Sequence, residues 1–208
     1  MTSPFFTIKA PTVTATPVLV EVPHAGLAIP ESVRDEIVVP RDAIMRDADI
    51  YVDKLYADSP SRGATLLTTP VSRYVLDLNR AMDDIDRDTV PDHPAPRPVQ
   101  PRGIVWRTTT DGRPAVKAPM SYETLKKRID TFHVPYHAAL RAELDRIQAQ
   151  FGYVILLAAH SMPSSGRPGH LDSGARRADV VPGTRGRTTA DARIIDLVDA
   201  HFRDAGLS

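Results

Sequence analysis

The sequence predicts an α/β fold, in which apolar strands alternate with amphipathic helices. Two runs rich in Val, Leu and Ile, residues 18–22 and 153–159, have the composition of buried strands. Between them, apolar residues recur every three or four positions over residues 122–151, which predicts a long helix. A strand–helix–strand order with apolar strands is typical of a parallel or mixed sheet.

Further elements are expected between and beyond these segments. Residues 64–69 and 74–78 have the pattern of two more strands, and residues 44–56 are helix-like. Residues 194–202 predict a short final helix. The stretch 81–119 is dense in proline and charge, so we expect a long surface excursion, partly ordered by Trp106.

Capping residues and prolines predict where the helices begin, bend and end. Ser121 suits the N-cap of the long helix and Gly152 suits the position after its end. Pro135 should kink this helix because it has no N–H and crowds the preceding turn. Pro30 suits the first turn of an earlier helix, which Pro40 would end.

Composition excludes several classes of function. The chain has 208 residues, enough for one substantial core, and its 26 basic residues balance 26 acidic ones. A neutral chain has no bulk charge for a nucleic-acid backbone or an anionic membrane, so neither partner is expected. The absence of cysteine excludes a thiolate nucleophile and cysteine-bound zinc. With no signal-like N-terminus and no long apolar run, we expect a single cytoplasmic domain over residues 1–208.

Two histidines follow predicted strands directly. His24 comes after the first apolar run and His160 after the last. The carboxyl ends of parallel strands lie on one edge of a sheet, so the two imidazoles can converge. With one carboxylate, they would form the two-histidine, one-carboxylate set of a catalytic zinc. The alternative is two unrelated histidines at loop starts.

Other polar residues allow more than one interpretation. His133 and His137 have the spacing for joint metal binding on a helix, but the glutamate of a zinc-protease motif is absent. A supporting role, a substrate-contacting role or a plain position on the helix surface is therefore favoured. Arg73 and Arg80 flank a predicted strand and offer guanidiniums to a carboxylate, although salt bridges explain them equally well. Ser161 lacks the strained elbow of a serine nucleophile.

Several longer segments together resemble the N-formylglutamate amidohydrolase family. They follow the family's order over roughly residues 18–184, and the run from Ser72 to Arg80 is the most specific. The segments are Val22-Pro-His-Ala-Gly26, Arg46-Asp-Ala-Asp49, Gly63-Ala64, Ser72-Arg-Tyr-Val-Leu-Asp-Leu-Asn-Arg80, Pro135-Tyr-His137, Ala159-His-Ser-Met162 and Asp179 through Gly183-Thr184.

The resemblance implies a three-layer α/β/α fold with a mixed, mostly parallel sheet, like that of zinc carboxypeptidases. It implies hydrolysis of a small N-acyl amino acid, in the first place N-formyl-L-glutamate to formate and L-glutamate, in histidine degradation. It also implies Zn²⁺ or another divalent metal on His24, Asp49 and His160, with Asp47 as the rival carboxylate. The catalytic set would be Arg73, Asn79, Arg80 and His137, the first three holding the substrate's carboxylates, with Trp106 closing the site.

The sequence departs from the family at its end. Members continue into a strand carrying a glutamate, the general base by analogy with zinc carboxypeptidases, whereas this sequence ends at Ser208. We therefore expect residues 1–208 to lack that strand and its glutamate. Three alternatives follow: the chain is truncated, another group acts as base, or the chain is a degenerate metal- or ligand-binding module. An amidohydrolase or peptidase for a different N-acyl amino acid is a further alternative.

Overall fold

The computed structural model describes residues 2–96, 101–167 and 172–208. The chain forms two compact units, Met1–Ser161 and Met162–Ser208. Every predicted site residue lies in the first unit. The single domain over residues 1–208 stays a prediction.

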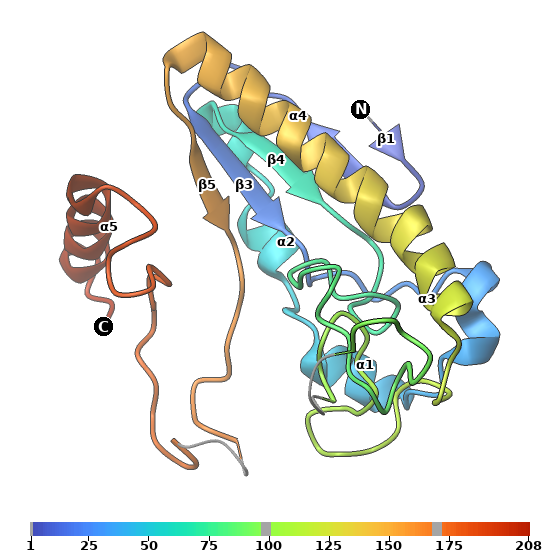
Figure 1. The fold of residues 1–208 in the computed structure, drawn as a ribbon. Helices are drawn as coiled ribbons and strands as arrows, with labels where there is room; N and C mark the ends of the chain where they lie inside the picture. The colour runs from blue at the N-terminus through green and yellow to red at the C-terminus, as the bar shows by residue number, and fades with distance from the viewer. Residues whose placement is uncertain (1, 97–100, 168–171) are drawn as a thin grey trace. The chain divides into compact units, whose positions relative to one another are not determined.

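The first unit is built on a five-stranded mixed sheet (Figure 1). The strand order is β1-β2-β4-β3-β5, and β3 pairs in parallel with both β4 and β5. On the other side, β2 pairs antiparallel with β4 and β1 pairs antiparallel with β2. The strands are β1 (Thr2–Ser3), β2 (Phe6–Lys9), β3 (Val18–Val22), β4 (Thr65–Thr68) and β5 (Ile155–Ala158).

Alternate residues of the central strands face two different helical layers, because successive side chains of a strand point to opposite faces. Leu19 and Leu67 pack with residues of the long helix, including Leu140. Val20 and Leu66 pack on the other side, in a cluster that includes Val52 at the start of a short helix. These two cores confirm the three-layer α/β/α architecture.

The helices differ in part from the prediction. Pro40 precedes a helix rather than ending one, and residues 44–56 contain two short helices separated by a bend. The described helices are η1 (Glu31–Glu36), α1 (Arg41–Asp47), α2 (Val52–Leu55), η2 (Ser59–Arg62), α3 (Tyr122–Arg128), η3 (Ile129–His133), α4 (Val134–Phe151) and α5 (Ala192–Asp204).

The long helical stripe forms α3, η3 and α4, which follow one another without a break. The Ser121 hydroxyl accepts the Thr124 N–H, and Gly152 has a left-handed conformation with φ 80°, so both predicted caps are confirmed. The middle segment η3 is a π-helix, and Pro135 lies directly after it in the first turn of α4. A wider turn accommodates a residue that has no N–H to donate, which explains why the irregularity lies here.

Residues 74–78 do not form a strand, which corrects the prediction. The segment is a buried turn, in which the Val75 N–H donates to the Ser72 carbonyl at 2.9 Å. Tyr74 and Val75 are both fully buried. The apolar pattern therefore reflects burial on both sides of a turn and not a pleated strand.

The stretch 81–119 is also more buried than a surface excursion, apart from residues 97–100, which lie outside the described residues. Ile85, Val90 and Ile104 are buried and pack with Leu125 and Ile129 of the α3–η3 region. Trp106 is 6% exposed and packs with Tyr74 and Ala115. The stretch carries its own part of the hydrophobic core.

The second unit contains α5, which confirms the predicted final helix and extends it by two residues at each end. The arginines of this tail pair with acidic neighbours: Arg177 with Asp172, and Arg187 with Asp196. Among the described residues, no helix is long and apolar enough to cross a membrane.

Candidate metal centre

His24, Asp49 and His160 converge in the first unit. His24 lies two residues after β3 and His160 two residues after β5. Because these strands are parallel neighbours, their carboxyl ends share one edge of the sheet. Asp49 lies two residues after α1, and its N–H donates to the His24 carbonyl at 3.0 Å. Each residue offers one ligand atom, and these atoms all lie within 4.8 Å of one another.

The donor set fits a divalent metal. The Nδ1 atoms of His24 and His160 are 3.2 Å apart, and Asp49 Oδ2 is 2.9 Å from the His160 nitrogen. Asp49 Oδ2 is also 3.6 Å from His24 Nδ1. His24 and Asp49 are buried, whereas the His160 side chain is 33% exposed, so the cluster opens on one side. Two imidazoles and one carboxylate, with access from one side, are the composition of a catalytic zinc site.

Electrostatics favour an ionised carboxylate at the centre. Burial raises the pKa of Asp49, but hydrogen bonds from His160 and His24 outweigh it and hold the pKa well below its usual range. Burial lowers the pKa of His24, whereas hydrogen bonds to Asp49 and Asp77 raise it, and the net pKa is above its ordinary value. In this metal-free arrangement His160 Nδ1 lies within hydrogen-bond distance of Asp49, and His24 Nδ1 accepts from Arg73.

Asp47 has different partners. It accepts hydrogen bonds from the Tyr74 hydroxyl, from the Thr110 hydroxyl and N–H, and from Arg46. Helix α1 ends at Asp47, and Ala48 is extended with φ −82° and ψ 154°, so the two aspartates diverge. The structure places Asp49, and not Asp47, with the histidines.

Arg73 and Asn79 lie beside the cluster. Arg73 donates to His24 Nδ1 and to the Asp47 carbonyl, and its guanidinium lies 4.7 Å from the centre of the Trp106 ring. Asn79 Nδ2 lies 3.2 Å from His160 Nε2. These two predicted residues therefore contact the two histidines of the centre.

Arg80 and His137 are one step further away. The Arg80 side chain is 44% exposed and lies 3.7 Å from the Asp84 carboxylate. His137 Nε2 donates to the Leu78 carbonyl at 2.9 Å, and His133 Nε2 donates to the Arg80 carbonyl at 3.0 Å. Burial lowers the pKa of both histidines, which suits neutral rings that donate to backbone. They hold the backbone on either side of Asn79.

Two buried carboxylates of this region were not predicted from the sequence. Asp77 lies 2.7 Å from His24 Nε2, on the opposite side of the ring from the cluster. Glu21 of β3 accepts the Tyr136 hydroxyl at 2.9 Å, and burial raises its pKa. Asp77 belongs to the specific Ser72–Arg80 run, and Glu21 is an acidic residue inside an apolar strand. These two features of the sequence could have drawn attention to Asp77 and Glu21.

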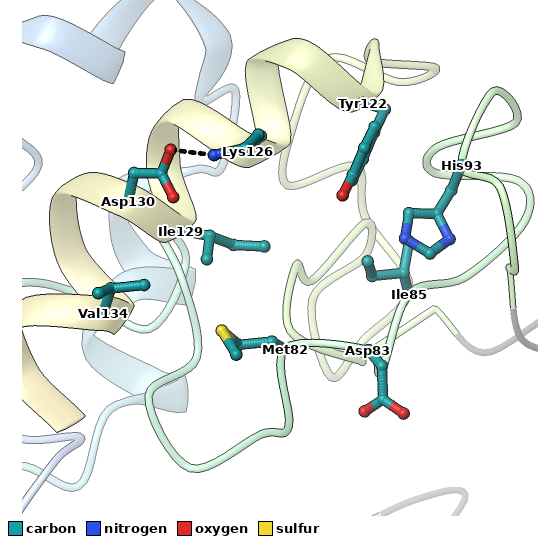
Figure 2. Close-up of a pocket in the computed structure, with 9 residues that line it drawn as sticks. All are labelled: Met82, Asp83, Ile85, His93, Tyr122, Lys126, Ile129, Asp130 and Val134. Carbon is teal, nitrogen blue, oxygen red and sulfur yellow. Dashed lines mark hydrogen bonds and ion pairs between the residues drawn. The ribbon is translucent and has the colours of Figure 1, made fainter. Parts of the chain in front are cut away.

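A second concave region of about 290 Å³ contains none of the cluster residues (Figure 2). Ile85 and Ile129 supply apolar surface, and an ion pair between Lys126 and Asp130 lies on one wall. The residues that line it are Met82, Asp83, Ile85, His93, Tyr122, Lys126, Ile129, Asp130 and Val134.

The fold and the cluster of His24, Asp49 and His160 define the chain as an α/β protein with a candidate two-histidine, one-carboxylate metal centre. The sequence model for N-formylglutamate amidohydrolase matches residues 16–208. The chain belongs to the N-formylglutamate amidohydrolase family.

Curated relatives support the same family. The N-formylglutamate deformylase of Pseudomonas putida is 35% identical over 153 residues, which cover 71% of this chain and 52% of the relative. The N-formylglutamate deformylase of Pseudomonas aeruginosa is 31% identical over 190 residues, 88% of this chain and 65% of the relative. The chain thus spans about half to two thirds of the length of these relatives.

Solved structures support the fold. The crystal structure of N-formylglutamate amidohydrolase from Ralstonia eutropha matches with a TM-score of 0.88 and 30% identity, over 99% of this chain and 75% of that chain. A protein from Agrobacterium tumefaciens matches with a TM-score of 0.58 and 18% identity, over 76% of this chain and 56% of that one. The second likeness concerns the fold alone.

Proposed function

We propose that this protein is a metal-dependent amidohydrolase that cleaves N-formyl-L-glutamate to formate and L-glutamate. The observation that carries the proposal is the convergence of His24, Asp49 and His160 within 4.8 Å at one edge of the sheet. The names of the two Pseudomonas relatives and of the Ralstonia structure support the substrate.

His24, Asp49 and His160 would hold the metal, and their donor atoms suit zinc while leaving other divalent ions open. When bound there, zinc would polarise the amide carbonyl and lower the pKa of a bound water to about 7. The partly exposed His160 marks the side from which a small substrate can approach.

Arg73 and Arg80 would bind the two carboxylates of the substrate, with Asn79 between them. His24 Nδ1 has one lone pair, so it cannot accept from Arg73 and bind a metal at the same time. In the metal-bound protein, that Arg73 donor is therefore available to a substrate carboxylate, for which a guanidinium has matching geometry. His133 and His137 contribute by holding the Leu78 and Arg80 carbonyls, and through them the backbone that carries Asn79.

The proposed partner is a small N-acyl amino acid rather than a nucleic acid or a membrane, because the chain carries a formal net charge of +0. We place the protein in the cytoplasm and its reaction in histidine degradation. Both assignments follow from the family and from the cysteine-free composition.

The experiment is an assay of glutamate release by zinc-loaded protein, with N-formyl-L-glutamate and N-acetyl-L-glutamate compared at equal concentration. We expect release from the formyl substrate in preference to the acetyl one. Release from the acetyl compound alone would reassign the acyl group. Stoichiometric zinc without release from either compound would contradict the proposal and favour another acyl substrate or a metal-binding module that has lost catalysis.

A further inference from the structure

We propose that Asp77, held in place by Trp106, is the positioning residue that directs His24 Nδ1 toward the cluster. The proposal deepens the proposed function, since it rests on a metal held by His24, Asp49 and His160. In this arrangement, a single carboxylate links Trp106 to the metal ligand His24, which lies 82 positions earlier in the chain.

Both oxygens of Asp77 are used, and the side chain is fully enclosed. Oδ1 accepts from His24 Nε2 at 2.7 Å and from the Asn79 N–H at 2.9 Å. Oδ2 accepts from Trp106 Nε1 at 3.0 Å. Asp77 is 1% exposed and His24 is 2% exposed, so water does not compete for these bonds.

The bonds of Asp77 fix both the rotation of the imidazole and its tautomer. A carboxylate accepts hydrogen bonds, so His24 Nε2 carries the proton and, in the neutral ring, Nδ1 keeps its lone pair. Nδ1 is the atom that lies 3.2 Å from His160 Nδ1. Ligand histidines are typically oriented by such a bond at their second nitrogen.

Trp106 acts as the anchor of the carboxylate. The indole N–H of Trp106 can only donate a hydrogen bond. It therefore suits the acceptor Oδ2, and it cannot itself accept from His24. The ring itself is held on two sides, by Tyr74 edge-to-face at 5.7 Å and by the Arg73 guanidinium at 4.7 Å. Trp106 therefore helps to hold the carboxylate, together with Arg73, whose Nε lies 3.5 Å from the same Oδ2 atom. The carboxylate in turn holds the ring that carries the ligand nitrogen.

Substitution of Asp77 by Asn tests this arrangement without changing the size of the side chain. An amide has one oxygen and one NH₂ group, whereas Asp77 faces donors on both sides. The NH₂ group must therefore meet either His24 Nε2 or Trp106 Nε1. An NH₂ group that faces Trp106 Nε1 loses that hydrogen bond. An NH₂ group that faces His24 Nε2 can be accepted only by a ring whose proton has moved to Nδ1, the nitrogen directed at the cluster.

The experiment measures zinc affinity by competition with a chromogenic chelator, in wild type, Asp77→Asn and Trp106→Phe. We expect Asp77→Asn to weaken zinc binding by about 10- to 100-fold, the usual effect of losing a residue that orients a metal ligand. Trp106→Phe keeps an aromatic ring and removes one hydrogen bond, so we expect a loss of about 2- to 10-fold. The matched control is Asp86→Asn, a buried aspartate at 2% exposure that binds Thr89 and Arg107 instead, and its affinity should equal that of wild type.

Trp106 also supplies a direct signal, because it is the only tryptophan in the chain. Zinc added to wild type or to Asp86→Asn should change the Trp106 emission, and in Asp77→Asn that change should be strongly reduced. If Asp77 only stabilised the fold, Asp77→Asn would lower stability, but the folded variant would keep the zinc-dependent change in Trp106 emission.

The outcomes separate this inference from the proposed function. Zinc affinity unchanged in folded Asp77→Asn and Trp106→Phe would overturn the positioning role and leave the metal centre intact. If Asp77→Asn does not fold, Trp106→Phe decides, and an unchanged affinity contradicts the proposal. No zinc binding by wild type would overturn both.

Discussion

Asp47 and Asp49 are two positions apart and have different surroundings. Asp47 is held by Tyr74 and Thr110, which are 27 and 63 positions away, while Asp49 faces His160, 111 positions away. Spacing alone does not separate their roles, because their partners come from distant segments. The end of helix α1 at Asp47 is what separates them.

The two aspartates should respond differently to substitution. We expect Asp49→Asn to remove most zinc binding, because it loses the charged ligand. Asp47→Asn should keep zinc and lower the free energy of unfolding by about 1–3 kcal/mol, since buried hydrogen bonds to a charged group are lost. Metal content and urea unfolding of both variants test this. Loss of zinc from Asp47→Asn, with full binding in Asp49→Asn, would reverse the assignment.

The effect of Asp47 on stability also has a predicted pH dependence. Burial raises its pKa, but bonds from Arg46, Thr110 and Tyr74 outweigh it and lower the pKa from 3.8 to about 2. A lowered folded-state pKa stabilises the protein above the unfolded pKa, and this stabilisation is lost as pH falls toward 2. The difference between wild type and Asp47→Asn should therefore shrink over that range. A difference that grows on acidification would contradict this account.

At the scale of elements, local chemistry predicted some features and not others. Ser121 and Gly152 were predictable because caps depend on neighbouring backbone groups. The turn at residues 74–78 was not, because a buried turn and a strand share an apolar pattern. Strands β1 and β2 were missed because they are short. Pairing rather than their own sequence defines them: β2 pairs with β4, and β1 pairs with β2.

The loop after β3 is held against residues 70–72 by backbone contacts. A Cβ on Gly26 would lie 2.5 Å from the carbonyl oxygens of both Pro70 and Val71, so backbone would have to move. We expect Gly26→Ala to lower the free energy of unfolding by about 1–3 kcal/mol, the usual cost of overpacking. It should also weaken zinc binding, because His24 lies in this loop and Arg73 follows the facing segment.

Thermal unfolding and chelator competition test the effect of Gly26→Ala. Gly183→Ala is the control, since an added Cβ there meets nothing within 4 Å. Wild-type stability and zinc affinity in Gly26→Ala would show that the loop tolerates the displacement and would refute the close-packing argument.

At the scale of the whole molecule, the centre joins segments that are up to 136 positions apart. Its two histidines were predictable because each ends a strand and parallel strands end on one edge. Asp77 and Glu21 were not, because their roles depend on His24 Nε2 and Tyr136, partners that sequence spacing does not reveal.

Metal binding should therefore stabilise the unit Met1–Ser161 as a whole. A ligand at 100 times its Kd adds about 2.7 kcal/mol. For a chain of this size, that corresponds to a rise in Tm of about 5–10 °C. Calorimetry of chelated and zinc-loaded protein measures the rise, and Asp49→Asn should show little of it. An equal rise in that variant would place the stabilising zinc elsewhere.

The central claim, a metal-dependent hydrolysis at the cluster of His24, Asp49 and His160, is tested most directly by following glutamate release through chelation and metal return. We predict that protein as prepared with zinc releases glutamate from N-formyl-L-glutamate, that chelation stops the release, and that one equivalent of zinc restores it. Release that continues at full rate in protein shown to be free of metal would contradict the claim.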